Sequence, residues 1–160
     1  MARFRIVGIS FDHMHMGDLL RCVQDHPDAE IAGIFDPDRA TMQRAIDAFG
    51  IPDDRVFTDF DACMAATKPD LAILCAAPTK HADYTRRLAA CGVHVLVEKP
   101  FASSTADARA MIDAMQPTGK TLAINWPLRW VESHVTAKRL VDEGMIGQVI
   151  EIHSYGGNRG

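Results

Sequence analysis

The chain has few cysteines, and none is spaced for a metal site or a disulfide framework. The four are Cys22, Cys63, Cys75 and Cys91, and they include no C-x-x-C pair. Cys75 falls in an apolar, strand-like segment and the other three fall in helix-like segments. We therefore expect buried free thiols, which suit a reducing compartment.

An excess of basic residues and a long apolar run are also absent. Lys and Arg number 17 against 21 Asp and Glu, a formal charge of −4 that is spread along the chain. Nucleic-acid-binding proteins more often gather positive charge on one face, so we expect no nucleic-acid partner. No apolar stretch reaches the roughly 18 residues of a membrane span, and the first residues do not form a signal peptide. We expect a cytoplasmic protein without membrane contact.

What is present is a serial alternation of strand-length apolar runs with segments of helical period. The run Leu71–Cys75 is apolar without alternation, which indicates a strand covered on both faces, as in a parallel sheet between helix layers. We predict an α/β fold with a doubly wound parallel sheet, of the Rossmann type, over residues 1–124. The predicted strands are 4–9, 30–35, 56–57, 70–75, 93–97 and 121–124, and the predicted helices are 14–23, 39–49, 59–67, 81–91 and 104–115.

The texture changes after Asn125. Residues 126–130 are aromatic and interrupted by proline, a helix is predicted over 135–143, and alternating apolar residues predict a strand over 148–154. A glycine-rich tail follows. We expect residues 125–160 to be the incomplete start of a second, α+β domain.

The turn after the first predicted strand has part of a dinucleotide-binding fingerprint. Gly8, Ser10 and His13 occupy the three positions where such a turn prefers glycine. Ser10 is small enough for close approach to a pyrophosphate and can donate a hydrogen bond, whereas His13 is bulkier than the pattern prefers. Ala76 and Pro78, after the fourth predicted strand, would let a dinucleotide lie across the carboxyl edge of the sheet.

Asp36 ends the second predicted strand and favours NAD as the cofactor. A carboxylate at that strand end can accept hydrogen bonds from the adenosine ribose hydroxyls, and it would repel a 2′-phosphate. Two alternatives stay open. Asp36 can instead start the turn with Pro37 and cap the next helix, and Arg39 nearby is compatible with NADP.

Two histidines near the first turn invite a metal interpretation. His13 and His15 stand two residues apart, so they do not share a helix face, and no acidic residue or cysteine stands at metal-ligand spacing. We predict no metal site.

Three segments together resemble the Gfo/Idh/MocA family of glucose–fructose oxidoreductase, inositol dehydrogenase and rhizopine catabolism proteins. They are P-T-K-H at 78–81, G-V-H-V-L-V-E-K-P at 92–100 and D-E-G-M-I-G at 142–147. The resemblance implies that Lys99 lies beside the nicotinamide and the reacting hydroxyl, where it stabilises developing charge or relays a proton. It also implies that Glu98 orients or tunes Lys99, that His81 lies on the cofactor side, and that Arg129 lies near the substrate. Trp126 suits either stacking on a sugar ring of the substrate or packing between domains, and both interpretations stay open.

The resemblance implies an NAD(P)-dependent dehydrogenase that transfers a hydride between a nicotinamide cofactor and a CH–OH group of a sugar, inositol or related polyol. An aspartate and a histidine of a second domain, beyond residue 160, would complete its active site. A homo-oligomer is expected for the full-length protein. Two other functions stay open: an NAD-dependent glycoside-cleaving enzyme of the same fold, and a non-catalytic nucleotide-binding module.

Overall fold

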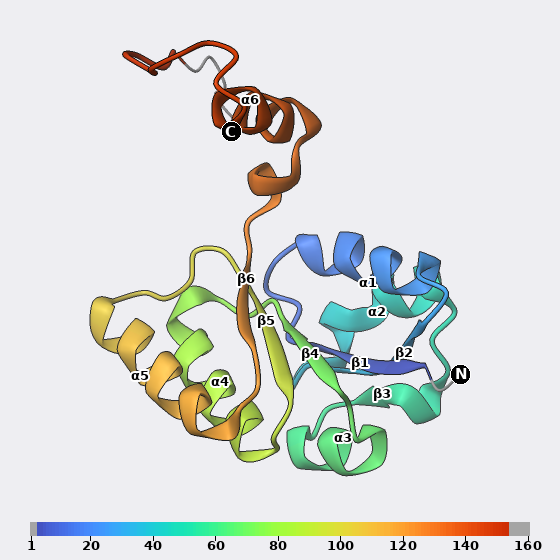
Figure 1. Cartoon of the computed structure of the whole chain (residues 1–160). Coiled ribbons are helices and arrows are strands. Elements are labelled where there is room, and N and C mark those ends of the chain that lie inside the picture. The colour runs from blue at the N-terminus through green and yellow to red at the C-terminus, as the bar shows by residue number, and fades with distance from the viewer. Residues whose placement is uncertain (1–2, 154–160) are drawn as a thin grey trace. The chain divides into compact units, whose positions relative to one another are not determined.

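A computed structural model of the chain describes residues 3–153 (Figure 1). Six strands form one parallel sheet in the order β3-β2-β1-β4-β5-β6. This order reverses between β1 and β4, so the predicted doubly wound Rossmann arrangement is confirmed. The strands are β1 (Phe4–Ile9), β2 (Ala29–Phe35), β3 (Val56–Phe57), β4 (Leu71–Leu74), β5 (His94–Glu98) and β6 (Leu122–Asn125).

Helices connect the strands, and their ends follow local side-chain chemistry. Asp38, Asp59 and Ser104 accept hydrogen bonds from backbone N–H groups in the first turns of α2, α3 and α5. Gly50 ends α2 with a φ of 60°, a conformation that glycine adopts readily. The helices are α1 (His15–Asp25), α2 (Arg39–Phe49), α3 (Phe60–Thr67), α4 (His81–Ala90), α5 (Thr105–Met115) and α6 (Glu132–Asp142), with 3₁₀ turns at Asp53–Arg55, Pro78–Lys80, Gln116–Thr118 and Pro127–Trp130.

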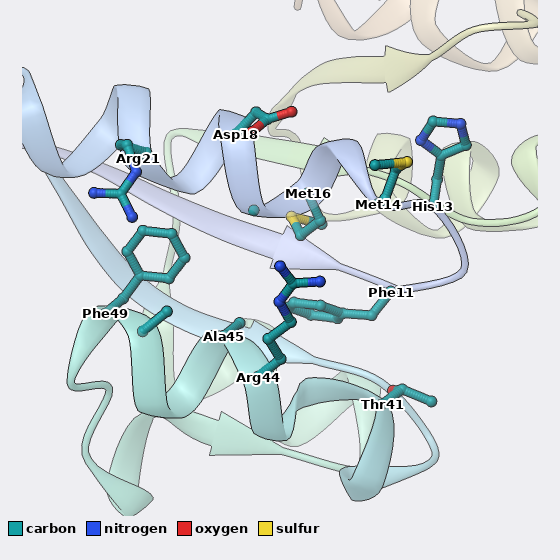
Figure 2. Close-up of a pocket in the computed structure, with 12 residues that line it drawn as sticks. Phe11, His13, Met14, Met16, Asp18, Arg21, Thr41, Arg44, Ala45 and Phe49 are labelled. Carbon is teal, nitrogen blue, oxygen red and sulfur yellow. The ribbon is translucent and has the colours of Figure 1, made fainter. Parts of the chain in front are cut away.

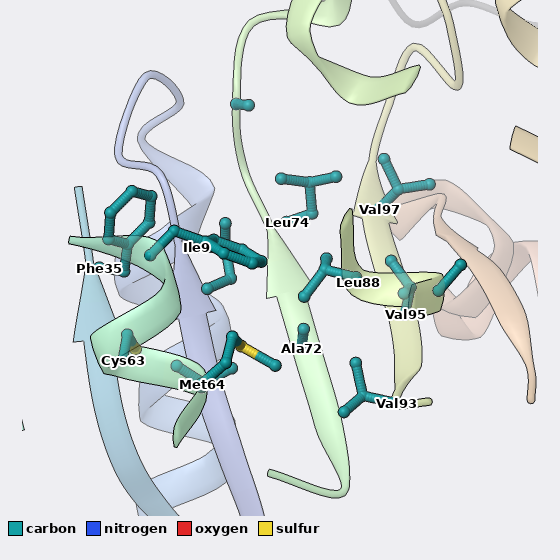
Figure 3. Packing of buried hydrophobic residues seen from close by; sticks show 14 of the residues in the cluster. Ile9, Phe35, Cys63, Met64, Ala72, Leu74, Leu88, Val93, Val95 and Val97 are labelled. Carbon is teal, nitrogen blue, oxygen red and sulfur yellow. The ribbon is translucent and has the colours of Figure 1, made fainter. Parts of the chain in front are cut away.

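The hydrophobic core has two halves, one on each face of the sheet. Side chains of β1 alternate between them: Ile6 packs with α1 and α2, whereas Val7 and Ile9 pack with α3, α4 and α5. Figure 3 shows the second half, in which residues of four strands meet α3 and α4. Because helices cover both faces, a central strand such as β4 must be apolar throughout, as its sequence predicted.

The chain divides into two compact units, residues 1–125 and 126–160. The first unit contains the sheet and both halves of the core. In the second, the predicted strand over 148–154 is wrong for residues 148–153, which form no strand, and residue 154 lies outside the described residues. A strand needs a neighbour for its backbone hydrogen bonds, and the described part of this unit contains no other strand. Among the described helices, none has the length and apolar composition needed to cross a bilayer.

Candidate cofactor and catalytic site

The carboxyl ends of the strands gather the predicted site residues of the first unit at one edge of the sheet. The chain leaves β1 into α1 on one face and leaves β4 towards α4 on the other. Parallel sheets bind ligands at such a switch point. The residues at or near this edge are Gly8, Ser10, His13, Asp36, Ala76, Pro78, His81, Glu98 and Lys99.

In the loop after β1, Ser10 adopts a backbone conformation that glycine usually supplies. Ser10 has a φ of 63°, in the left-handed region that favours glycine, and it is buried. Its N–H donates a 2.8 Å hydrogen bond to the carbonyl of Phe35. At Gly8 an added Cβ would lie 3.1 Å from the Met16 sulfur. The close packing of β1 against α1 therefore depends on a residue without a side chain at this position.

Asp36 joins the loop after β1 to the loop after β2. Its Oδ2 accepts a 2.8 Å hydrogen bond from the Phe11 N–H and lies 3.4 Å from the Ser10 hydroxyl, and its Oδ1 accepts a 2.9 Å hydrogen bond from the Asp38 N–H. The helix cap of α2 is Asp38, so the capping part of the alternative for Asp36 is wrong, whereas the hydrogen bond from the Asp38 N–H fits Asp36 as the start of the turn with Pro37. A carboxylate oxygen can accept a second hydrogen bond, so the ribose contact stays a prediction.

A second carboxylate in the same loop was not predicted as part of the site. Asp12 Oδ2 accepts hydrogen bonds from the Ala77 N–H at 2.8 Å and from Lys80 Nζ at 2.9 Å. Burial alone would raise the pKa of Asp12, but the hydrogen bond from Lys80, with smaller contributions, lowers it below its usual value. The ion pair of Asp12 with Lys80 links the loops that follow β1 and β4. Because the two residues lie 68 positions apart in the sequence, no local pattern predicted this contact.

Lys99 follows the last residue of β5, and two groups surround its ammonium position. Nζ lies 3.2 Å from His13 Nε2 and 3.7 Å from Glu98 Oε1. The Lys99 side chain is 37% exposed, whereas that of Glu98 is 1% exposed. The His13 N–H donates a 3.1 Å hydrogen bond to the carbonyl of Cys75, which holds the loop after β1 beside the end of β4. The structure thus brings His13 together with the neighbouring residues Glu98 and Lys99 from a distant part of the sequence.

Glu98 is held from two further sides. Its Oε1 lies 3.0 Å from His15 Nδ1, and its Oε2 accepts a 2.7 Å hydrogen bond from Asn125 Nδ2. Glu98 and Asn125 are paired in register as the last residues of β5 and β6, which is the signal that could have revealed Asn125. Neither His15 nor Asn125 was predicted as a site residue.

The premise that the two histidines lack an acidic partner is wrong. One potential ligand atom each from His13, His15 and Glu98 lies within 4.8 Å of the others. Lys99 Nζ lies near both His13 and Glu98, so a metal ion held by these residues would meet the Lys99 side chain. The prediction of no metal site stays a prediction.

His81 is fully buried and supports the edge from inside. Its Nε2 lies 2.8 Å from the carbonyl oxygen of Ala76, and its Nδ1 lies 3.0 Å from that of Phe101. The imidazole therefore links the loop after β4 to the segment after Lys99. Pro78 begins the short turn that leads into α4. A direct contact of the His81 side chain with a cofactor has no support in this arrangement, because both ring nitrogens face backbone carbonyls.

A cavity of about 320 Å³ lies between α1 and α2 (Figure 2). Phe11, Arg21, Arg44 and Phe49 line it, and the Arg21 guanidinium lies 5.3 Å from the centre of the Phe49 ring. His13 lies at one end of this cavity, but Lys99 does not line it. The cavity therefore adjoins the cluster around Lys99 through His13.

The two predicted substrate residues lie in the second unit. Trp126 is half exposed, and Arg129 has its guanidinium 5.4 Å from the centre of the Trp130 ring. Their roles near a substrate stay predictions.

Known proteins are similar to this chain in sequence and in fold. The chain is 30% identical over 145 residues to D-apiose dehydrogenase of Paraburkholderia graminis, covering 89% of this chain and 36% of the relative. It is 27% identical over 152 residues to inositol 2-dehydrogenase of Salmonella paratyphi B, covering 92% of this chain and 44% of the relative. A crystal structure of an Agrobacterium radiobacter oxidoreductase in complex with NAD⁺, L-tartaric acid and magnesium superposes with a TM-score of 0.84 at 25% identity, over 92% of this chain and 42% of that one.

The chain spans less than half the length of each of these relatives. Residues 2–126 match the profile of an oxidoreductase family with an NAD-binding Rossmann fold. The predicted resemblance is confirmed, and the expectation of NAD as the cofactor agrees with this description. The chain belongs to the Gfo/Idh/MocA oxidoreductase family.

Proposed function

We propose that the protein is an NAD-dependent dehydrogenase that transfers a hydride between a nicotinamide cofactor and a CH–OH group of a sugar, inositol or related polyol. One observation carries the proposal: Lys99, held between His13 and Glu98, lies at the carboxyl edge of a sheet with Rossmann order. The dehydrogenase relatives named above support the substrate class.

The residues at this edge fit a dinucleotide. Ser10 holds the left-handed conformation of a fingerprint glycine, and Asp36 stands at the end of β2 with acceptor capacity left for ribose hydroxyls. Small residues at Ala76 and Ala77 follow β4. We propose that Gly8, Ser10 and Asp36 hold the adenosine half, and that Glu98 and Lys99 face the nicotinamide half.

When bound, NAD⁺ supplies the hydride acceptor. The chain's own part in the reaction is proton handling at Lys99 Nζ, which either accepts the hydroxyl proton or stabilises the negative charge that develops on oxygen. Glu98 is buried and fixed by Asn125 and His15, so it can hold Lys99 in place without turning towards solvent. Turnover requires residues that contact the substrate, and we propose that a second domain supplies most of them.

Replacement of Lys99 tests the catalytic assignment. Lys99→Met should lower kcat by about 100-fold or more, the scale of a lost general acid–base group, and should leave the Kd for NAD within a few-fold. Steady-state kinetics of the full-length protein with a panel of polyols measure kcat, and calorimetry with NAD measures the Kd. Lys138→Met, an exposed lysine on α6, is the matched control. Unchanged turnover in Lys99→Met would rule out the role.

Replacement of Asp36 tests the cofactor assignment. Asp36→Ser should narrow the preference for NAD over NADP by about tenfold, since a charged hydrogen bond to the ribose is lost together with repulsion of a 2′-phosphate. Asp36→Asn keeps an acceptor oxygen for the Phe11 N–H and serves as the comparison for loop damage. An unaltered ratio of the two affinities in both variants contradicts the ribose contact.

The proposal also includes the cellular compartment and the oligomeric state of the protein. Cys63 and Cys75 are buried free thiols, and burial raises the pKa of each to about 12. Cys22 and Cys91 are exposed, which corrects the expectation that all four are buried. Free thiols support a reducing, cytoplasmic setting. We also propose that the full-length protein is a homo-oligomer, which sedimentation of that protein would test.

A further inference from the structure

His13 contacts the residue that the proposed function makes catalytic, although it lies outside every motif that identified Lys99. Its Nδ1 accepts a 3.2 Å hydrogen bond from the backbone N–H of His15, and its Nε2 lies 3.2 Å from Lys99 Nζ. A neutral imidazole carries one ring proton. Because Nδ1 acts as an acceptor, that proton belongs on Nε2, where it points at Lys99.

A hydrogen bond from His13 Nε2–H needs a lone pair on Lys99 Nζ. An ammonium has three donors and no acceptor, whereas an amine has a lone pair. We infer that His13 is a positioning residue for Lys99: its Nε2–H donates to the Lys99 amine and holds that nitrogen at the end of β5 as a proton acceptor. The inference rests on the proposed function and adds a residue to it.

The groups around the pair act in opposite directions. Glu98, 3.7 Å from Lys99 Nζ, favours the ammonium, and His13 opposes it by presenting a donor. Burial, the largest cause, holds the pKa of His13 below its usual value, while Glu98 acts against it. A neutral His13 is thus expected at neutral pH. The titratable groups that face the pair come from β5 and α1: Glu98 and His15. The Cys75 thiol, at the end of β4, interacts with Glu98.

The proton balance of alcohol oxidation follows from this arrangement. The substrate O–H bond breaks and its proton goes to the Lys99 amine, while the C–H bond breaks and its hydride goes to NAD⁺. A carbonyl compound, NADH and the Lys99 ammonium result. His13 is partly exposed, so the proton can pass from this pair to water. Loss of His13 would leave Glu98 to favour the ammonium, which cannot take the next proton.

The position of the imidazole proton can be measured without turnover. Long-range ¹H–¹⁵N spectra of the ¹⁵N-histidine-labelled protein at pH 8 distinguish the two tautomers, and His13→Gln assigns the His13 signals. We expect His13 to carry its proton on Nε2. A proton on Nδ1 would overturn the inference. Because this readout needs neither NAD nor a substrate, it decides the inference even where no polyol is turned over.

Kinetics separate positioning from mere structural support. His13→Gln retains an N–H donor, whereas His13→Phe fills the space without one. Wild-type kcat should fall at acid pH. His13→Phe should shift that acid limb upward by about one pH unit and lower kcat about tenfold at pH 7, since one unit is a tenfold change in the amine fraction. His13→Gln should restore kcat to within about threefold, and His26→Phe, at an exposed site, is the control.

Two outcomes of the kinetic experiment contradict the inference. One is a pH profile of His13→Phe that superposes on the wild type while melting temperatures match. The other is loss of wild-type activity with a chelator and its recovery with Zn²⁺, which would make His13, His15 and Glu98 metal ligands and Lys99 their neighbour.

Discussion

Ser10 combines a side chain with a left-handed backbone conformation that favours glycine. Its φ of 63° carries a steric cost for a residue with a Cβ, although its hydroxyl lies 3.4 Å from Asp36. Ser10→Gly should raise the free energy of unfolding by about 0.5 to 1 kcal/mol, because the relief of strain exceeds the loss of a long hydrogen bond and the entropy cost of glycine. Urea denaturation measures the difference.

Ser10→Ala is the matched comparison for this residue. Alanine keeps the Cβ and loses the hydroxyl, so it should not stabilise the protein. A gain for alanine equal to that for glycine would show that the hydroxyl, and not the backbone conformation, is the source of the cost.

At the scale of elements, the two loops at the switch point are joined by an ion pair. The folded pKa of Asp12 is lowered, so the stability it contributes is present above the unfolded value of 3.8 and is lost as the pH falls through the folded pKa. Lys80→Met should therefore destabilise the protein at pH 7 by less than about 1 kcal/mol, the scale of exposed ion pairs, and should have a smaller effect near pH 3. Denaturation at the two pH values makes the comparison.

A double-mutant cycle shows whether the effect belongs to the pair. Asp12→Asn and Lys80→Met should not add, since either change removes the same charge interaction. Full additivity at pH 7 would mean that the two residues act independently, through the Ala77 N–H in the case of Asp12.

At the scale of the whole molecule, stability resides in the first unit. Both halves of the core lie within residues 1–125, while the second unit exposes large apolar side chains such as Trp130 and Ile150. A chain ending at residue 125 should therefore melt within a few degrees of the 160-residue chain and bind NAD with a similar Kd. Circular dichroism and calorimetry compare the two. A much lower melting temperature would show that the second unit stabilises the sheet.

Local sequence determined the elements of the first unit, because their signals are short in range. Periodicity and chain-breaking residues predicted the ends of the strands and helices up to Asn125 to within two residues. The apolar run of β4 predicted that both faces of this strand are covered. The strand predicted at 148–154 failed for its described residues, because pairing depends on a partner strand and not on alternation alone.

The sequence by itself also determined the family, and it predicted Asp36 and Lys99 as site residues, Asp36 because it directly follows a predicted strand and Lys99 through the family resemblance. Only the tertiary structure decided which side chains meet there. His13 reaches Lys99 and His15 reaches Glu98 across more than 80 residues of sequence. Parallel strands bring their carboxyl ends to one edge whatever their separation along the chain, so contacts at that edge follow strand order, which no local pattern encodes.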